Sequence, residues 1–283
     1  MQRFKIIHRT YYNYSSSVVL GTHNLLLRPR ENHELRIESF LLNITPKAKI
    51  LWHRDVEDNS VAIADFQDPA QQLFIESEVV IQQYNESPLD FIVSNYAINY
   101  PFKYQNNDKF ILSAYMVLPN EQTRILLNNW IFNIYKLNEE IQTYTLLQRL
   151  TTYIYKNLIY KIREEVGVQN PDVTLTLGTG SCRDFAYLFM EAVKCLGFAS
   201  RFVSGYLYAP LMSEQVGSTH AWAEVYLPGA GWKGFDPTIG NIVGKDHIPV
   251  AVSRVPDNIS PISGSFSGVA TSSLDVGVWV TLC

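Results

Sequence analysis

Cys182 lies within the segment GTGSCRDFAYLFM (residues 178–190), between a glycine-rich run and apolar residues at helical spacing. Counting back from Phe185 places it in the first turn of a predicted helix. At such a position, unpaired N–H groups and the helix dipole stabilise an anion and lower thiol pKa values from ~8.5 towards ~3.5–7.5. The same amides can hold the oxyanion of a tetrahedral intermediate. We therefore interpret Cys182 as a nucleophile, the alternative being a small buried side chain at a helix end.

A thiolate nucleophile requires an imidazole within reach, both as its partner ion and as the proton donor for the leaving group. His220 begins the strand-like segment HAWAEVYL, which follows the predicted helix. The other histidines fall in the N-terminal region or in the C-terminal tail (His8, His23, His33, His53 and His247). We therefore select His220. A lone histidine at a strand end is ordinarily a polar edge residue, so this choice depends on Cys182.

Asp236 ends the segment GWKGFD, which we expect to form a hairpin with HAWAEVYL. In this hairpin Asp236 is the candidate for the residue that orients the His220 imidazole. A four-residue loop would place Asp236 opposite Ala223, on the face away from His220. A three-residue loop or one bulge would place it opposite Trp222, on the same face as His220. We therefore predict a three-residue loop or a bulge, the alternative being an aspartate that only starts a turn.

The elements that position these residues follow from the pattern of apolar side chains. Short strand-like segments fill residues 4–84, which predicts an N-terminal β-sandwich-like domain. Beyond a less periodic stretch, helical spacing predicts a helix capped by Asn120, a second over about 139–163 and the one that contains Cys182. The expected fold class is α+β, with a β-rich domain over 1–115 and a catalytic core over 116–283.

Three strand-like segments follow the Cys182 helix, namely ASRFVSGYLY, HAWAEVYL and GWKGFD. We expect Gly197 to end this helix and the helix to pack on the antiparallel sheet that the three segments form. The remainder, from Pro237 to Cys283, is rich in Gly, Ser and Pro and ends on the apolar run VGVWV. We predict that this run forms an edge strand packed on the core.

The composition argues against several classes of function. The 23 basic and 27 acidic side chains give a net charge of −4, so there is no electrostatic reason to expect nucleic acid as a partner. No apolar run approaches the ~18 residues that a membrane-spanning helix needs, and the N-terminus lacks the apolar region of a signal peptide. We therefore expect a cytoplasmic protein that does not bind membranes.

We expect neither a cofactor nor a metal. The three cysteines are irregularly spaced and form no CxxC pair, which argues against a disulfide framework and against structural zinc. The run GTGSCR begins like the dinucleotide fingerprint G-x-G-x-x-G, but Arg183 stands at the third glycine position. Zinc bound by a Cys-His-Asp trio is the alternative that stays open.

Two blocks, GSCRDFAYLFMEAVKCLGFASRFVSGYLY and STHAWAEVYLPGAGWKGFDPT, resemble the transglutaminase-like superfamily of papain-related cysteine enzymes. The motifs G-x-C-x-D-F, S-T-H-A-W and G-W-x-x-F-D-P-T occur in order over about residues 120–245. The opening FKIIHRTYYNYSSSVVLGTHNLLLRPR and the later VAVSRVPDNISPISGSFSG are similar to the bacterial branch. The resemblance therefore covers essentially the whole chain and implies a papain-like core.

Carried over by position, the resemblance implies Cys182 as nucleophile, His220 as general acid and base, and Asp236 as the residue that orients His220. Ser181 and Arg183 depart from the commonest bacterial pattern, GVCQD, and Arg183 adds a positive charge near the sulfur. Neither change removes a catalytic group.

The resemblance also implies a reaction in which the thiolate attacks an amide carbonyl, releases an amine and leaves a thioester. Water as acceptor gives a peptidase or amidase, whereas a lysine amine gives a transglutaminase. We favour hydrolysis of a peptide or isopeptide bond in a peptide or protein substrate, since nothing in the sequence indicates a dedicated amine site. The alternatives are an acyl transferase and a catalytically idle binding module.

Overall fold

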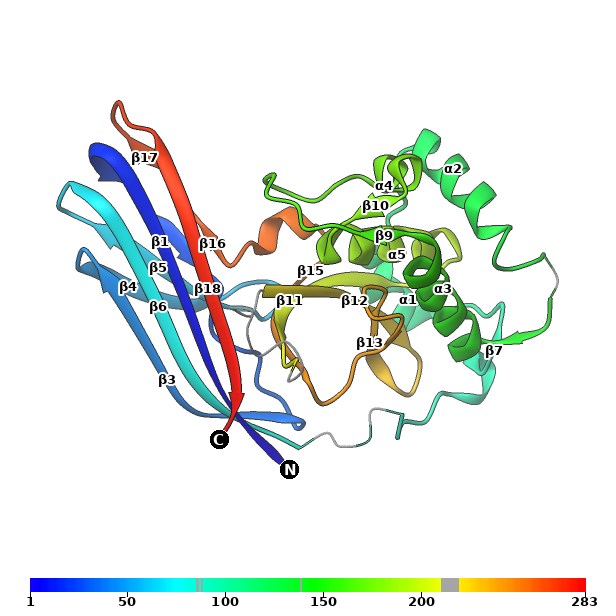
Figure 1. Ribbon diagram of the computed structural model, residues 1–283. Coiled ribbons are helices and arrows are strands. Elements are labelled where there is room, and N and C mark those ends of the chain that lie inside the picture. Colours follow the sequence, from blue (N-terminus) through cyan, green and yellow to red (C-terminus); the bar gives the residue numbers. More distant parts are fainter. Residues whose placement is uncertain (85–86, 88, 138, 210–218) are drawn as a thin grey trace.

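The computed structural model shows a β-rich part beside a part in which helices lie over an antiparallel sheet (Figure 1). The structure describes residues 1–84, 87, 89–137, 139–209 and 219–283. The expected combination of helices with antiparallel sheets is confirmed.

Two sheets form the β-rich part. Their strands are β1 (Gln2–Leu20), β2 (His23–Leu25), β3 (Leu35–Thr45), β4 (Ala48–Arg54), β5 (Ser60–Phe66), β6 (Ala70–Gln83), β16 (Ile262–Ser263), β17 (Phe266–Ser267) and β18 (Ser272–Leu282). One sheet has the order β17, β1, β6, β3, with β18 also paired to β1, and the other has the order β16, β2, β5, β4. Alternate side chains from both sheets, among them Leu25, Ala64 and Ile75, form one buried cluster, as period-two alternation predicts.

The last strand, β18, corrects the predicted organisation of the chain. It pairs antiparallel with β1 along its length and ends with Leu282 opposite Phe4. We predicted an edge strand packed on the core; β18 is an edge strand and Val278 packs against Tyr206 and Ile248, but the strand pairs with β1 and joins the N-terminal sheet. The strand lies at the edge of the N-terminal sheet because Val278 completes the buried cluster around Phe4. The boundary near residue 115 stays a prediction.

Substitution in β18 should show how much this strand stabilises the protein. Val278 is fully buried, whereas Val276 on the same strand is 42% exposed. We expect Val278→Ala to lower the free energy of unfolding by ~2 kcal/mol, because a buried side chain is lost. Val276→Ala should change it by less than ~0.5 kcal/mol. Urea denaturation of both variants tests this, and equal losses would contradict the placement of β18.

The second part is built on a five-stranded sheet. Its strands are β11 (Ser200–Leu207), β12 (Thr219–Leu227), β13 (Gly231–Asp236), β14 (Asn241–Ile242) and β15 (His247–Ser253). They lie in the order β14, β13, β12, β11, β15, and every neighbouring pair is antiparallel. Two of these strands, β14 and β15, come from the segment after Pro237 that we treated as a tail. The sheet is therefore wider than the three predicted strands.

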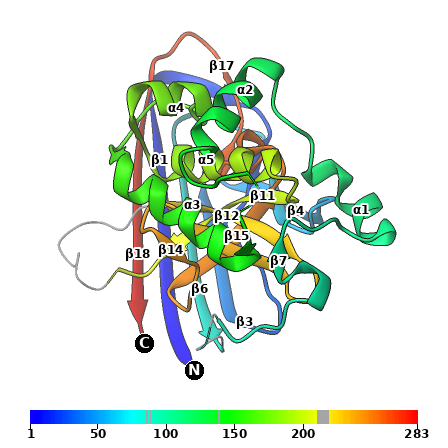
Figure 2. The same cartoon turned by 90° about the vertical axis from the view of Figure 1, so that its right-hand side faces the viewer.

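Helices cover one side of this sheet, as Figure 2 shows. The longer ones are α2 (Glu121–Ile131), α3 (Thr143–Asn157) and α5 (Cys182–Cys195). Shorter elements connect them, namely η1 (Asn95–Ala97), β7 (Asn99–Tyr100), α1 (Asn106–Leu112), η2 (Ser113–Tyr115), β8 (Ile141–Gln142), β9 (Ile159–Tyr160), α4 (Pro171–Leu177), β10 (Thr179–Gly180) and η4 (Pro256–Ile259). Within the described ranges, none of the helices combines the length and the apolarity that crossing a lipid bilayer requires.

The three predicted helices are present, with one shorter than expected. Asn120 caps α2, since its side chain accepts a hydrogen bond from the N–H of Thr123. The predicted helix over 139–163 is α3, which ends earlier because Leu158 adopts an extended backbone and leads into β9. Gly197 follows the end of α5 with a φ of +87°, which a glycine adopts without strain.

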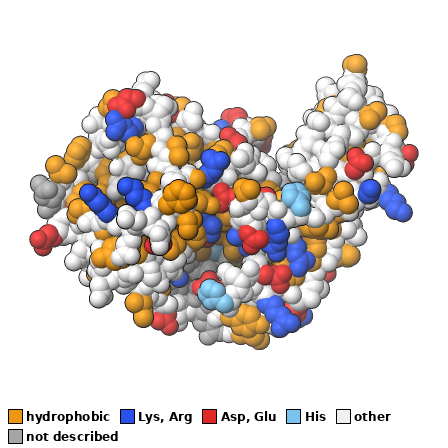
Figure 3. Space-filling view, turned by 180° about the vertical axis from the view of Figure 1, so that it is seen from behind, with side chains coloured by type: hydrophobic (Ala, Val, Ile, Leu, Met, Phe, Trp, Pro, Cys, Tyr) orange, Lys and Arg blue, Asp and Glu red, His pale blue; other side chains and the backbone are white. Residues whose placement is uncertain are grey.

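The two parts meet along the first β sheet. Phe4 and Ile6 of β1 share a buried cluster with Tyr206 of β11 and Ile248 of β15. Seen from behind, the surface is hollowed between the β-rich part and the helical part (Figure 3). Strand β15 therefore lies at the junction, in contact with both.

Candidate active site

Cys182 is the first residue of α5, and Ser181 is its N-cap. A capping box closes this end, in which Asp184 Oδ2 accepts hydrogen bonds from the Ser181 N–H at 2.8 Å and the Ser181 hydroxyl at 2.7 Å. Cys182 is half-buried and packs against the main apolar cluster. The N–H groups of Asp184 and Phe185 donate to the Ser181 carbonyl, which leaves those of Cys182 and Arg183 to face an anion beside the sulfur.

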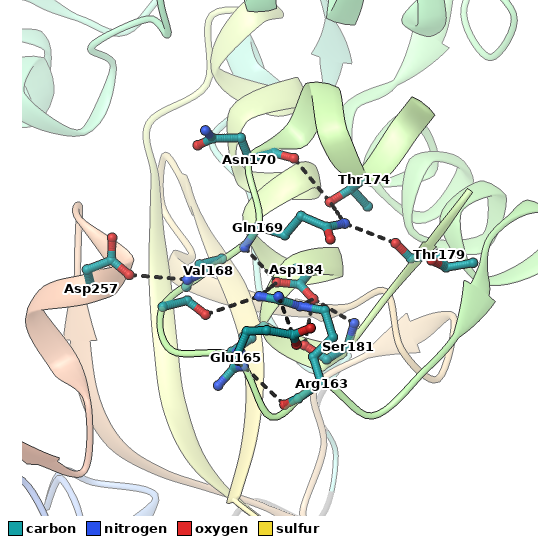
Figure 4. Close-up of polar contacts among 12 residues, drawn as sticks. Arg163, Glu165, Val168, Gln169, Asn170, Thr174, Thr179, Ser181, Asp184 and Asp257 are labelled. Atoms are coloured by element: carbon teal, nitrogen blue, oxygen red, sulfur yellow. Dashed lines mark hydrogen bonds and ion pairs between the residues drawn. The ribbon is translucent and has the colours of Figure 1, made fainter. Parts of the chain in front are cut away.

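Asp184 also anchors the loop over residues 163–169 (Figure 4). Its carboxylate is fully buried and accepts hydrogen bonds from Arg163 Nε and from the Gln169 N–H, both at 2.8 Å. Burial raises the pKa of Asp184, but these hydrogen bonds outweigh burial and lower it. Arg183 holds the same loop, since its Nη2 donates to the backbone carbonyls of Arg163 and Glu165. The loop is therefore fixed by Arg183 and Asp184, the two residues that follow the cysteine.

The hairpin register places the histidine and the aspartate on one face of the sheet. Leu227 lies opposite Gly231, which leaves a three-residue loop, as predicted. Continued by one step, this register brings Asp236 opposite Trp222, and His220 lies on the same face. The distance between His220 Nε2 and Asp236 Oδ2 is 2.6 Å. Asp236 is fully buried, so this pair is shielded from water.

Cys182 and Asp236 together determine the charge of His220. Burial lowers the pKa of His220, but the charge of Asp236, the hydrogen bond to it and a hydrogen bond to Cys182 raise that pKa to about 10. Burial raises the pKa of Asp236, but the charges and hydrogen bonds of two histidines lower it well below its usual range. Because Nε2 of His220 faces the aspartate, Nδ1 is the ring nitrogen left for the sulfur. The three predicted residues are therefore brought together, with His220 paired to Asp236 and sharing a cleft with Cys182.

The raised pKa of His220 predicts that the protein loses stability in alkali. In the unfolded chain this pKa returns to ~6.5, so the folded state holds an extra proton at higher pH. The stabilisation is complete below pH ~6.5 and is lost as the pH rises through about 10. We expect the free energy of unfolding in urea to fall between pH 7 and 9.5, by at most ~1.4 kcal/mol per pH unit. His220→Gln should show a smaller fall, and an equal fall would contradict a protonated His220.

Cys182 and His220 both line a cleft of about 260 Å³. Tyr160 and Phe202 give it apolar walls, and one side is formed by η4. The two rims touch, because the Val168 N–H donates to Asp257 Oδ1 at 3.3 Å. The thiol therefore lines a partly apolar cleft together with His220.

One residue beside the candidate site escaped the sequence prediction. His247 is on β15, not in a tail, and its Nε2 lies 3.1 Å from Asp236 Oδ2. A signal was present in the segment HIPVAVS, whose β-branched residues indicate a strand. The pairing of that strand with β11 could not be read from one sequence.

Two family models match the chain in order. The bacterial transglutaminase-like N-terminal region matches residues 4–82, and the transglutaminase-like superfamily core matches residues 135–237. The chain belongs to the bacterial transglutaminase-like superfamily. Cys182, His220 and Asp236 all fall within the matched core of this transglutaminase-like protein.

Relatives of similar length exist in mycobacteria. An uncharacterized protein of Mycobacterium leprae is 24% identical over 287 residues, which cover 99% of each chain. An uncharacterized protein of Mycobacterium bovis is 25% identical over 300 residues, covering 98% of this chain and 91% of the relative. Both alignments therefore extend over nearly the full length of this transglutaminase-like protein.

A solved structure from Cytophaga hutchinsonii, described as a putative cysteine protease, has the same fold. The TM-score is 0.75 at 17% sequence identity, and the match covers 99% of this transglutaminase-like chain and 90% of that one. At this identity the likeness concerns the fold alone.

Proposed function

We propose that this protein is a cysteine-dependent amide hydrolase that cleaves a peptide or isopeptide bond through a thioester. One observation carries the proposal. Cys182, at the N-terminus of α5, lines one cleft with His220, whose Nε2 lies 2.6 Å from the buried Asp236. These three residues are, in order, the nucleophile, the acid–base residue and the orienting residue that acyl transfer through sulfur requires. The β-sandwich-like N-terminal domain would support this core.

The geometry supports a defined sequence of steps. The Cys182 thiolate attacks the amide carbonyl, and the N–H groups at the start of α5 stabilise the oxyanion. The His220 imidazolium then donates its proton to the departing amine, which leaves the acyl group on sulfur as a thioester. A water molecule, deprotonated by the neutral imidazole, attacks the thioester, and the thiolate returns. Asp236 holds the ring in place throughout.

The molecule that accepts the acyl group in the second step distinguishes two enzyme activities. Water gives the hydrolase, and a primary amine gives a protein-glutamine acyl transferase. Adding a simple primary amine to a peptide digestion distinguishes them, since only the transferase incorporates the amine efficiently. A binding module without chemistry would yield neither product.

The proposal is tested first by the alkylation rate of Cys182 with iodoacetamide as a function of pH. A thiolate–imidazolium pair should react well below pH 7, and His220→Ala should slow the reaction at pH 6 by about a hundredfold. Mass spectrometry reports each cysteine separately. Cys195, at the far end of α5, is the internal control, because burial raises the pKa of its thiol to about 11.

Two results would overturn the proposal. Cys182 could react only near pH 8.5, like an ordinary thiol, or His220→Ala could leave its rate unchanged. In either case the thiol and the imidazole do not act as a pair, and the binding-module alternative replaces the hydrolase.

A further inference from the structure

Asp236 accepts more hydrogen bonds than the proposed catalytic trio explains. Its Oδ1 accepts from the Thr238 N–H at 2.8 Å. Its Oδ2 lies 2.6 Å from His220 Nε2 and 3.1 Å from His247 Nε2. His247 is 4% exposed, and its ring packs edge-on against Trp222. A second buried imidazole therefore shares the oxygen that faces the proposed acid–base residue.

The backbone around His247 determines which of its nitrogens carries a proton. The Gly244 N–H points to His247 Nδ1 at 3.2 Å. An N–H donor needs an acceptor, so Nδ1 is unprotonated and the proton is on Nε2. The Nε2–H then donates to Asp236 Oδ2. The direction of this hydrogen bond follows from geometry.

The position of the proton on His247 also indicates whether this cluster is a hydrogen-bond network or a metal centre. Ligand atoms of His220, Asp236 and His247 lie within 4.8 Å of one another, close enough in principle to hold a cation. A metal ion bound at His247 Nε2 would move the ring proton to Nδ1, where it would face the Gly244 N–H. Two donors would then oppose each other inside the protein, which is unfavourable. The cluster is therefore better suited to proton donors than to zinc.

The strand that carries His247 is held from outside the core. Asn59 of the β-rich part donates to the Val252 carbonyl of β15 and accepts from the Val252 N–H, both at 2.8 Å. Asn59 is fully buried, and it binds β15 as a neighbouring strand would. The Arg30 N–H adds a hydrogen bond to the Pro249 carbonyl at 2.9 Å. The β-rich part thus fixes the strand at two points on either side of its centre.

We propose that His247 is a positioning residue, which fixes the Asp236 carboxylate and, through it, the His220 imidazole. The β-rich part contributes to the active site by holding β15, on which His247 lies. This inference rests on the proposed function, since it assigns His247 a role in the acid–base chain of that site.

A matched pair of substitutions tests the donor itself. The glutamine of His247→Gln keeps an N–H donor at a similar reach, and the methionine of His247→Met fills a similar volume without one. We expect Cys182 alkylation at pH 6 to be about ten- to a hundredfold slower in His247→Met, because a misplaced ring protonates and orients poorly. The rate in His247→Gln should stay within about threefold of the wild type, since the donor is restored.

The outcomes distinguish this inference from the proposed function. The inference fails if the alkylation rate of Cys182 falls by the same factor in both variants, or falls in neither. In both cases the N–H donor does not position Asp236, even when the wild-type thiol reacts fast. If the wild-type thiol itself reacts like a free thiol, the proposed function fails. Thermal unfolding of both variants shows whether a slower rate merely reflects loss of the fold.

A second measurement needs no variant. Long-range ¹H–¹⁵N NMR spectra of the wild-type protein labelled at its histidines report which ring nitrogen carries the proton. We expect His247 to be neutral and protonated at Nε2. A neutral ring protonated at Nδ1 would reverse the hydrogen bond to Gly244 and overturn the inference.

Discussion

Replacing Cys182 by serine should reduce amide hydrolysis by about a thousandfold or more, because a serine hydroxyl in a site built for a thiolate is a poor nucleophile. Product release from a library of short peptides, followed by mass spectrometry, measures the loss. Binding of the same peptides should persist, since the sulfur is only one of the groups that line the cleft.

The chain provides its own control for this substitution. Cys195 is on the same helix, but it lies thirteen residues further along, and partial burial raises the pKa of its thiol to about 11. Cys195→Ser should leave hydrolysis within about twofold of the wild type. Equal activity of the two variants would show that Cys182 is not the nucleophile and would remove the basis for the thioester.

Loss of the Asp184 carboxylate should have the largest effect on stability. We expect Asp184→Ala to lower the free energy of unfolding by ~3–5 kcal/mol, because it leaves the Arg163 charge and the Ser181 N–H without their buried acceptor. The loop over residues 163–169 should also detach, so hydrolysis should fall with stability. Urea denaturation and peptide cleavage on the same sample measure both effects.

Glu165 is the exposed control that shows how much burial contributes to the effect of Asp184 on stability. It also pairs with Arg163, at 3.3 Å, but its side chain is 72% exposed. Glu165→Ala should therefore change the free energy of unfolding by less than ~0.5 kcal/mol. If the two alanine variants lost similar amounts, the buried network around Asp184 would not be what holds the start of α5.

Local rules were sufficient for the central part of the candidate site. Helical spacing located Cys182 at the start of a helix, and strand alternation reduced the position of Asp236 to two registers, of which the contact with His220 requires one. These predictions succeeded because the helix and the hairpin are formed by residues close together in the sequence.

The features that the sequence did not reveal depend on pairing between distant segments. His247 reaches Asp236 only because β15 pairs with β11, with a register shift between Ser204 and Gly205. Similarly, the run VGVWV has the alternation of a strand, but alternation does not say which sheet it joins. The alternation of apolar residues predicts a strand and its buried face. Which distant strand it pairs with depends on how the surfaces of the two sheets pack.

The pairing of β18 with β1 has a consequence for the order in which the protein is synthesised and folds. Phe4 leaves the ribosome long before its partner Leu282 is made. The candidate catalytic residues are therefore complete in the nascent chain before the N-terminal sheet can close. Until then β1 presents an unpaired edge on which a second nascent chain could add a strand. Translation of this protein thus includes a period in which its first strand must be shielded from aggregation.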